Sequence, residues 1–180
     1  MKNTKNAYHK ILMVLGVCMA SFIANADDNA QIQYSGKLIA LPCTIEPGMD
    51  NLYIDMGETD TRVLYRSGRG RGVEVNFSLK DCSTNLGNSI VGTFSGTTNS
   101  EGYLAFTSDS EAKGAAIGLE YLDGRPVAIG NGQGYSVPLI DGDMTVRLKA
   151  FLKGEQAALG NKGIIAGRYT AMLTYTLSYE

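Results

Sequence analysis

Few residues of this chain could do acid or base chemistry. The only histidine, His9, lies upstream of the apolar run 11–23. Three lysines precede that run and the small-x-small segment 24–26 follows it, which predicts a secretory signal peptide over residues 1–26. A retained membrane anchor is the alternative, but the run is shorter than the roughly 20 apolar residues of a span. A chain exported from Asp27 onward has no histidine, which excludes His-dependent triads and the common zinc sites.

Three other groups have compositions that can support chemistry. The glycine-rich segment 130–134 lacks the βαβ context and the Lys-Ser/Thr pair of a nucleotide loop, so it reads as a connection. The carboxylate pairs at 141 and 143 and at 109 and 111 could form a weak calcium site or a glycosidase pair, although both are ordinary turn compositions. Arg69 and Arg71 could contact a polyanion, but two such arginines more commonly belong to a solvated loop. We expect no catalytic residue, metal site or cofactor.

Two cysteines, Cys43 and Cys82, remain once the leader with Cys18 is removed. Export permits oxidation, so we expect these two to form a disulfide, with two free buried thiols as the alternative. In a chain-entropy picture, closing a loop of this length stabilises the fold by about 4 kcal/mol.

The charge balance argues against nucleic acid as a partner. Removing the leader lowers the basic count from 16 to 13 against 18 carboxylates, which leaves the exported chain acidic. No segment after the leader is long and apolar enough to predict a membrane span.

Short alternating runs separated by turn residues predict an all-β sandwich. Apolar and polar side chains alternate from Val73 to Lys80, and Asp-Gly turns interrupt later runs. The predicted strands are 73–79, 90–94, 102–106, 116–122, 126–129 and 145–152, with the segments 67–72 and 130–134 as connections. Helix is expected only within loops.

The segment 169–179 has the clearest strand pattern in the chain. Its odd positions are large or apolar, namely Tyr169, Ala171, Leu173, Tyr175, Leu177 and Tyr179, whereas its even positions are mostly Thr and Ser. This period of two predicts a half-buried strand. An end segment frays unless neighbours hold it, so we expect packing partners on both faces.

A second alternating segment lies just after the predicted cleavage site. Its apolar positions are Ala30, Ile32, Tyr34, Gly36 and Leu38, and the intervening residues are polar. A glycine inside a strand loses packing and entropy, so Gly36 suggests a place where another backbone comes close. From the pattern alone, an ordinary first strand of the same sheet remains the alternative.

Taken together, these features resemble the subunits of chaperone-usher pili, the type 1 and P fimbriae of Gram-negative bacteria. The resemblance spans the exported chain. It rests on the order of five features. The alternating extension with its inward glycine comes first, and the segment 36–43 then leads to the first cysteine. The second cysteine closes a strand at 79–82, and Gly167 and the penultimate Tyr179 follow.

The resemblance implies an incomplete immunoglobulin-like β-sandwich that lacks its last strand. The missing strand would leave a groove beside the strand that carries Gly167, Tyr169, Ala171, Leu173, Tyr175, Leu177 and Tyr179. A periplasmic chaperone would first fill the groove, and at the outer-membrane usher the extension of a neighbouring subunit would replace it. Residues 27–36 would then be the donor-strand extension, with Ala30, Ile32, Tyr34, Gly36 and Leu38 as its apolar positions, and residues 37–180 the pilin domain.

The expected function is that of a non-enzymatic pilus subunit exported through the periplasm to the cell surface. Such a subunit could be a shaft, minor tip or adaptor subunit in a head-to-tail polymer, supporting bacterial adhesion. The alternative is a single-domain secreted lectin-like adhesin that binds host glycans itself. The absence of Trp and the placement of most Tyr residues in strand patterns favour the pilus subunit over the lectin-like adhesin.

Overall fold

The structure is a computed structural model that describes residues 32–38 and 40–180. Ala30, and the residues of the leader, lie outside the described residues. Residues 32–38 belong to no helix or strand, and all seven of their side chains are exposed. The segment 40–180 forms the domain.

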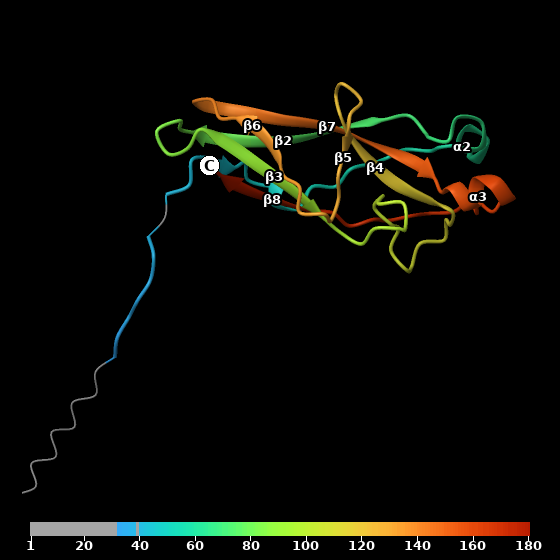
Figure 1. Cartoon of the computed structure of the whole chain (residues 1–180), viewed down its shortest axis with the longest axis horizontal. Coiled ribbons are helices and arrows are strands. Elements are labelled where there is room, and N and C mark those ends of the chain that lie inside the picture. The colour runs from blue at the N-terminus through green and yellow to red at the C-terminus, as the bar shows by residue number, and fades with distance from the viewer. Residues whose placement is uncertain (1–31, 39) are drawn as a thin grey trace, which may run out of the picture. The chain divides into compact units, whose positions relative to one another are not determined.

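The domain consists of two antiparallel sheets (Figure 1). The first sheet has the order β1-β2-β7-β4-β5, with β1 at Thr44–Ile45, β2 at Val73–Cys82, β7 at Gly142–Gly154, β4 at Ala115–Tyr121 and β5 at Pro126–Val127. The second has the order β6-β3-β8, with β6 at Tyr135–Pro138, β3 at Ser89–Ser95 and β8 at Thr174–Tyr179. The all-β sandwich predicted from the sequence is confirmed.

Helix is confined to connections, as predicted. A 3-10 turn spans Met49–Asn51, α2 spans Thr61–Ser67 and α3 spans Gln156–Asn161. The Asp60 side chain accepts a hydrogen bond from the Arg62 N–H at the start of α2, and Gly68 ends the helix at a φ of 72°. Within the described part of the chain, no helix has the length and apolarity needed to cross a membrane.

Two clusters of buried side chains fill the space between the sheets. The larger combines inward residues of β2, β4 and β7, such as Val75, Leu119 and Leu148, with Phe94 of β3. The smaller surrounds the cysteines and includes Leu79, Ile90 and Val146. The alternation along β2 and β7 therefore has the expected cause, since one face of each strand packs on the core.

The expected disulfide is present between Cys43 and Cys82, whose Cα atoms lie 4.1 Å apart. Cys43 precedes β1 and Cys82 ends β2, so the bridge ties the entry of the domain to a central pair of strands. Both residues are at least 95% buried.

Several predicted strand bounds are wrong. Segment 102–106 forms no strand, because the Asn99 carboxamide oxygen accepts hydrogen bonds from the N–H groups of Glu101 and Tyr103, which closes a turn. Only Leu104 makes isolated bridges there. The pattern over 169–179 forms a ladder only from Thr174 onward. The short strands β1 and β6 were not predicted.

Replacing both Cys43 and Cys82 with Ser is expected to lower the free energy of unfolding by about 2–5 kcal/mol, because the unfolded chain regains loop entropy. Urea unfolding of the purified chain with and without reductant measures this. A non-reduced digest analysed by mass spectrometry should yield the linked peptides, and recovery of two free thiols from oxidised material would contradict the pairing.

Candidate functional site

The described domain has an apolar groove of about 1310 Å³. One wall is the segment 49–60 and the other is the segment 167–177. The floor is made of core side chains, including Val75, Phe77, Phe94, Leu119 and Leu148. The groove thus opens the interior of the sandwich to the outside.

The wall that contains β8 is an unpaired sheet edge. β8 pairs with β3 and with no other strand of the described residues. The Glu180 N–H donates to the Ser89 carbonyl at 3.2 Å, and the Ser89 N–H donates back at 3.1 Å. Because antiparallel pairing alternates, the backbone groups of Tyr175, Leu177 and Tyr179 turn away from β3 and toward the open edge.

The same alternation continues before β8, although no ladder forms there. The carbonyl of Thr170 accepts from the Thr107 N–H at 2.8 Å, and that of Arg168 accepts from the Glu111 N–H at 2.9 Å. The residue between them, Tyr169, therefore turns its backbone groups to the other side, toward the groove. The open edge runs from Tyr169 to Tyr179. The sequence pattern identified this whole length, although it predicted a longer strand than the hydrogen-bonded one that forms.

The opposite wall leaves its sheet early. The Glu46 N–H donates to the Ser78 carbonyl at 3.2 Å, and residues 52–60 then continue outside any helix or strand. Ile54 and Met56 still pack on the core, whereas Tyr53 is 87% exposed. The wall 49–60 therefore follows β1 of the first sheet, the other wall leads into β8 of the second, and no strand of the described domain pairs with β8 on the groove side.

Aromatic rings form much of the groove lining. Tyr175 lies 4.5 Å from Phe77 and 5.0 Å from Phe94, measured between ring centroids. Tyr169 stacks on Phe106 at 4.7 Å. Burial raises the pKa of both tyrosines, and for Tyr169 the charge of Asp55 on the opposite wall adds to it. The buried Tyr169 hydroxyl has no hydrogen-bond partner among residues 32–38 and 40–180, so a polar group entering the groove would stabilise it.

The structure brings six of the seven predicted groove residues into this one cavity. They are Gly167, Tyr169, Ala171, Leu173, Tyr175 and Leu177. Tyr179 instead packs in the smaller core cluster, and its hydroxyl donates to the Cys43 carbonyl at 3.4 Å. The wall 49–60 was not identified from the sequence, although the apolar residues Leu52, Ile54 and Met56 recur at every second position and could have marked its inward face.

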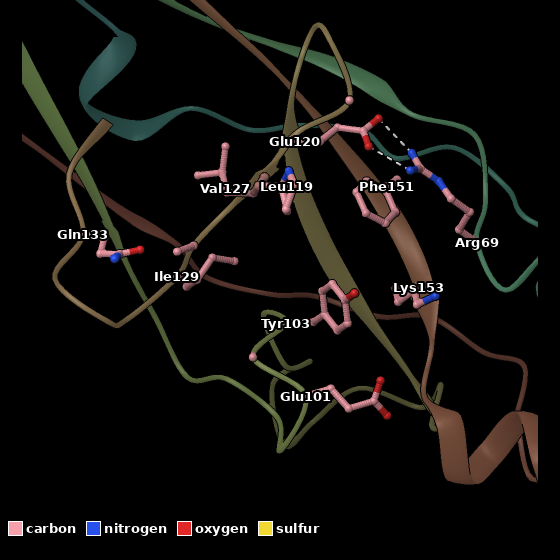
Figure 2. Close-up of a pocket in the computed structure, with 14 residues that line it drawn as sticks. Arg69, Glu101, Tyr103, Leu119, Glu120, Val127, Ile129, Gln133, Phe151 and Lys153 are labelled. Carbon is pink, nitrogen blue, oxygen red and sulfur yellow. Dashed lines mark hydrogen bonds and ion pairs between the residues drawn. The ribbon is translucent and has the colours of Figure 1, made fainter. Parts of the chain in front are cut away.

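A second cavity of about 520 Å³ lies over β4 and β7 (Figure 2). The Arg69 guanidinium donates two hydrogen bonds of 2.8 Å to the Glu120 carboxylate and lies 3.7 Å from the centroid of the Phe151 ring. The side-chain hydrogen bonds from Arg69 lower the pKa of Glu120. The solvated-loop interpretation of Arg69 is therefore wrong, since its charge is neutralised by a residue 51 positions away.

The carboxylate pairs form no common site. Asp141 accepts hydrogen bonds from the N–H and hydroxyl of Thr84, whereas Asp143 pairs with Lys80 at 2.7 Å. Glu111 accepts from the Arg168 N–H. These carboxylates fix loops at separate places in the domain.

Comparison with known proteins gives the family of the chain. The family model described as fimbrial protein matches residues 32–180. The chain belongs to the fimbrial protein family. This fimbrial protein is 32% identical to the uncharacterized fimbrial-like protein YfcP of Escherichia coli K12, over 94% of this chain and 93% of that protein. It is 26% identical to the major MR/P fimbria protein of Proteus mirabilis HI4320, over 96% of this chain and 98% of the relative.

Solved structures agree on the fold. The P pilus rod subunit PapA superposes on this fimbrial protein with a TM-score of 0.66 at 19% identity, over 78% of this chain and all of the PapA chain. A chaperone-usher pilus structure gives a TM-score of 0.64 at 19% identity, over 86% of this chain and 97% of that chain. The fold is therefore the immunoglobulin-like fold of pilus subunits, and the chain is a structural fimbrial subunit.

Replacing Glu120 with Gln is expected to lower the free energy of unfolding near pH 7 by about 1–3 kcal/mol, because Arg69 loses its charged acceptor. A carboxylate whose pKa is lower in the folded than in the unfolded chain stabilises the folded state at pH values above its unfolded pKa. This stabilisation is lost as the pH falls through the folded-state pKa. The difference between wild type and Glu120→Gln should therefore shrink below about pH 4.5. Urea unfolding at several pH values measures it, and a difference that stays constant down to pH 2 would contradict the assignment.

Proposed function

We propose that this fimbrial subunit polymerises by donor-strand exchange, in which the groove accepts a strand from a partner and the segment 27–38 is given to a neighbour. Each subunit would then complete the sandwich of the next one. The contact is head to tail and does not close, so it builds a filament.

The observation that carries this proposal is the open edge beside the groove. Backbone N–H and C=O groups of alternate residues from Tyr169 to Tyr179 point toward an apolar cavity and have no partner strand. A single added strand would pair these groups and cover the floor in one step, which is β-augmentation. Left open, such an edge is a template for aggregation.

The segment 27–38 has the chemistry that the groove requires. Its apolar positions, Ile32, Tyr34 and Leu38 among them, alternate with Gln31, Gln33, Ser35 and Lys37, so one face is apolar and the other polar. Four inserted apolar side chains at 1.5–3 kcal/mol each would contribute about 6–12 kcal/mol before ordering costs. Gly36 would let the donor backbone approach the groove closely.

The resemblance to chaperone-usher pilus subunits implies two helper proteins. A periplasmic chaperone would fill the groove until assembly, because the open subunit exposes its own core. An outer-membrane usher would be the place where the chaperone strand is exchanged for the extension of a neighbour. The subunit would be exported through the periplasm to the cell surface and would catalyse no reaction, and Ala30, Ile32, Tyr34, Gly36 and Leu38 would be the inserting positions.

Deleting residues 27–36 tests the donor role. The shortened chain should still fold, bind a synthetic peptide of residues 27–38 and show a raised melting temperature with it, but it should form no filament. Light scattering, electron microscopy and thermal unfolding measure these properties. A shortened chain that cannot fold even with the peptide present would mean that the segment is the domain's own strand, against the proposal.

Two neighbouring substitutions test the acceptor edge. Leu173 points into the groove and Met172 is 75% exposed, so Leu173→Asp should weaken binding of the 27–38 peptide by at least tenfold, in line with burying an unpaired charge. Met172→Asp, one residue away, should bind the peptide nearly as wild type does. Equal weakening by both changes, measured by fluorescence anisotropy of labelled peptide, would argue against this face as the acceptor.

A further inference from the structure

The cavity of about 520 Å³ over β4 and β7 is separate from the groove (Figure 2). The linings of the two share a single residue, Leu119. Apart from this residue, the proposed strand donation makes no use of the cavity. Its volume falls in the range of pockets that bind small ligands, roughly 300–1,000 Å³. A small molecule, or the terminal group of a larger one, would fit in it.

The cavity forms because two chain segments share one edge of β4. Leu104 exchanges two hydrogen bonds of 2.9 Å with Ile117, and Val127 pairs with Leu119 on the same edge. These pairs leave no room for either segment to continue along the strand, so the two segments part at this point. The chain before Leu104 then lines one side of the cavity, and the chain after Val127 lines the other.

Tyr103 is fixed in one wall of the cavity by its backbone. Its N–H donates to the Asn99 carboxamide oxygen at 3.0 Å, and its carbonyl accepts from the Asn99 N–H at 2.8 Å. The Asn99 carboxamide in turn donates to the Glu155 carboxylate at 3.0 Å, which ties the turn to the residue after β7. None of these bonds uses the Tyr103 side chain. The phenol ring is therefore positioned at the cavity and remains available to a ligand.

The floor of the cavity holds a charge pair over an aromatic ring. The Phe151 ring covers Gly118, where a Cβ atom would overlap it. The Arg69 guanidinium lies 3.7 Å from the centroid of this ring. Its two hydrogen bonds to Glu120 use two of its five N–H donors, and its side chain is 38% exposed. The remaining donors are held in a fixed orientation, so they can bind a hydroxyl oxygen without rearrangement.

The formal charges of the lining cancel. Its cations are Arg69 and Lys153, and its carboxylates are Glu101 and Glu120. Arg69 pairs with Glu120, whereas Lys153 and Glu101 have no salt-bridge partner in the part of the chain that the structure describes. A ligand with a net charge would leave water for a cavity that offers no net opposite charge, which is costly. The lining therefore favours a neutral ligand.

The lining also offers donors and acceptors together. One oxygen of Glu101 accepts from the Gln156 N–H at 2.7 Å, which leaves the other oxygen as an acceptor. The Gln133 carboxamide oxygen accepts from Asn131 at 3.3 Å, which leaves its NH₂ group as a donor. The rest of the lining is largely apolar and includes the Tyr103 ring. A suitable ligand therefore combines several hydroxyl groups with an apolar face.

We propose that this cavity binds a neutral saccharide ring, a role additional to the structural role of the subunit. The hydroxyl groups of a sugar both donate and accept hydrogen bonds, and the C–H face of its ring is apolar, as the lining requires. The chain has no Trp, so Tyr103 supplies the aromatic face on which the sugar stacks. Tyr103 belongs to a predicted strand that the structure replaces with a turn, and its ring therefore lines a surface cavity.

Titration of the purified chain with the methyl glycosides of glucose, galactose, mannose and N-acetylglucosamine tests the proposal. Calorimetry should give a Kd of about 1 mM or below for at least one of them. NMR should show the amide shifts concentrated in residues 101–103 and 127–133. Absence of binding by all four glycosides would overturn the saccharide site.

Charge is tested with the methyl glycoside of glucuronic acid. The acidic sugar should bind no more tightly than the best neutral one. Raising NaCl from about 20 to about 500 mM should change the Kd of the neutral glycoside by less than about twofold, because no net charge is screened. A salt-dependent preference for the acidic sugar would overturn the neutral class of ligand.

Substitutions in the cavity test its residues. Tyr103→Ala should weaken binding of the glycoside by at least about tenfold, whereas Tyr103→Phe keeps the ring and should stay within about threefold of the wild type. Gln133→Ala, at an exposed position, should weaken binding by at least about threefold through the loss of a donor. Leu86→Ala is the matched control, because Leu86 is 52% exposed and lines neither the cavity nor the groove.

Thermal unfolding shows whether each variant is folded. If Tyr103→Ala does not fold, Gln133→Ala and Tyr103→Phe still decide the outcome. Wild-type binding by Tyr103→Ala or by Gln133→Ala would overturn the assigned site. So would a loss of binding in Leu86→Ala as large as that in the cavity variants.

The synthetic peptide of residues 27–38 separates this site from strand donation. Because the groove and the cavity share only Leu119, peptide and glycoside should bind the same chain together, and the Kd of the glycoside should stay unchanged. Failure of the peptide to bind would overturn strand donation and leave the saccharide site standing. Competition between peptide and glycoside would overturn the separate cavity.

A longer neutral oligosaccharide that ends in the bound ring distinguishes two sources of the sugar. Binding at least as tight as that of the methyl glycoside assigns the end of a glycan chain as the ligand. Loss of binding on extension assigns a free sugar. The cavity holds a neutral saccharide in both cases, as proposed.

Discussion

The unpaired edge from Tyr169 to Tyr179 is the constraint on which the rest of this structure depends. Backbone groups in an apolar surrounding are costly unless they are hydrogen-bonded, and here alternate residues of one segment face a cavity with no strand to pair. β3 and the loop at 107–112 satisfy the other half of the same backbone. The segment is therefore held firmly on one side and left available on the other.

The side chains along this edge pack in the core although the backbone edge is open. Tyr175 lies between Phe77 and Phe94, and Tyr169 stacks on Phe106, so the aromatic lining is assembled without a partner strand. The disulfide fixes the entry of the chain against β2 at one end, and the Arg69–Glu120 pair joins the loop after α2 to β4 toward the other. Both long-range contacts lie on the sheet β1-β2-β7-β4-β5, so they stabilise that side of the sandwich independently of the groove edge at β8.

Two kinds of feature could be predicted from the sequence. The first depends on the local period of the apolar residues, and the second on the absence of residue types that a given chemistry requires. Alternation identified β2, β3, β4, β7 and the groove-facing residues of 169–179, because a period of two reports directly which side chains share a face. It failed where a side chain closes a turn, as Asn99 does beside Tyr103. It also missed the wall at residues 52–56, whose apolar residues alternate although the segment forms no strand. The Arg69–Glu120 pair was also beyond reach, since 51 residues separate its members and only the tertiary fold brings them together.

The open groove of the sandwich and the proposed assembly of subunits have the same energetic basis. A sandwich that closed its own groove would gain stability and lose the open edge beside β8. Under the proposed donor-strand exchange, completion is intermolecular, so the free energy that would have stabilised one subunit would stabilise the contact between two.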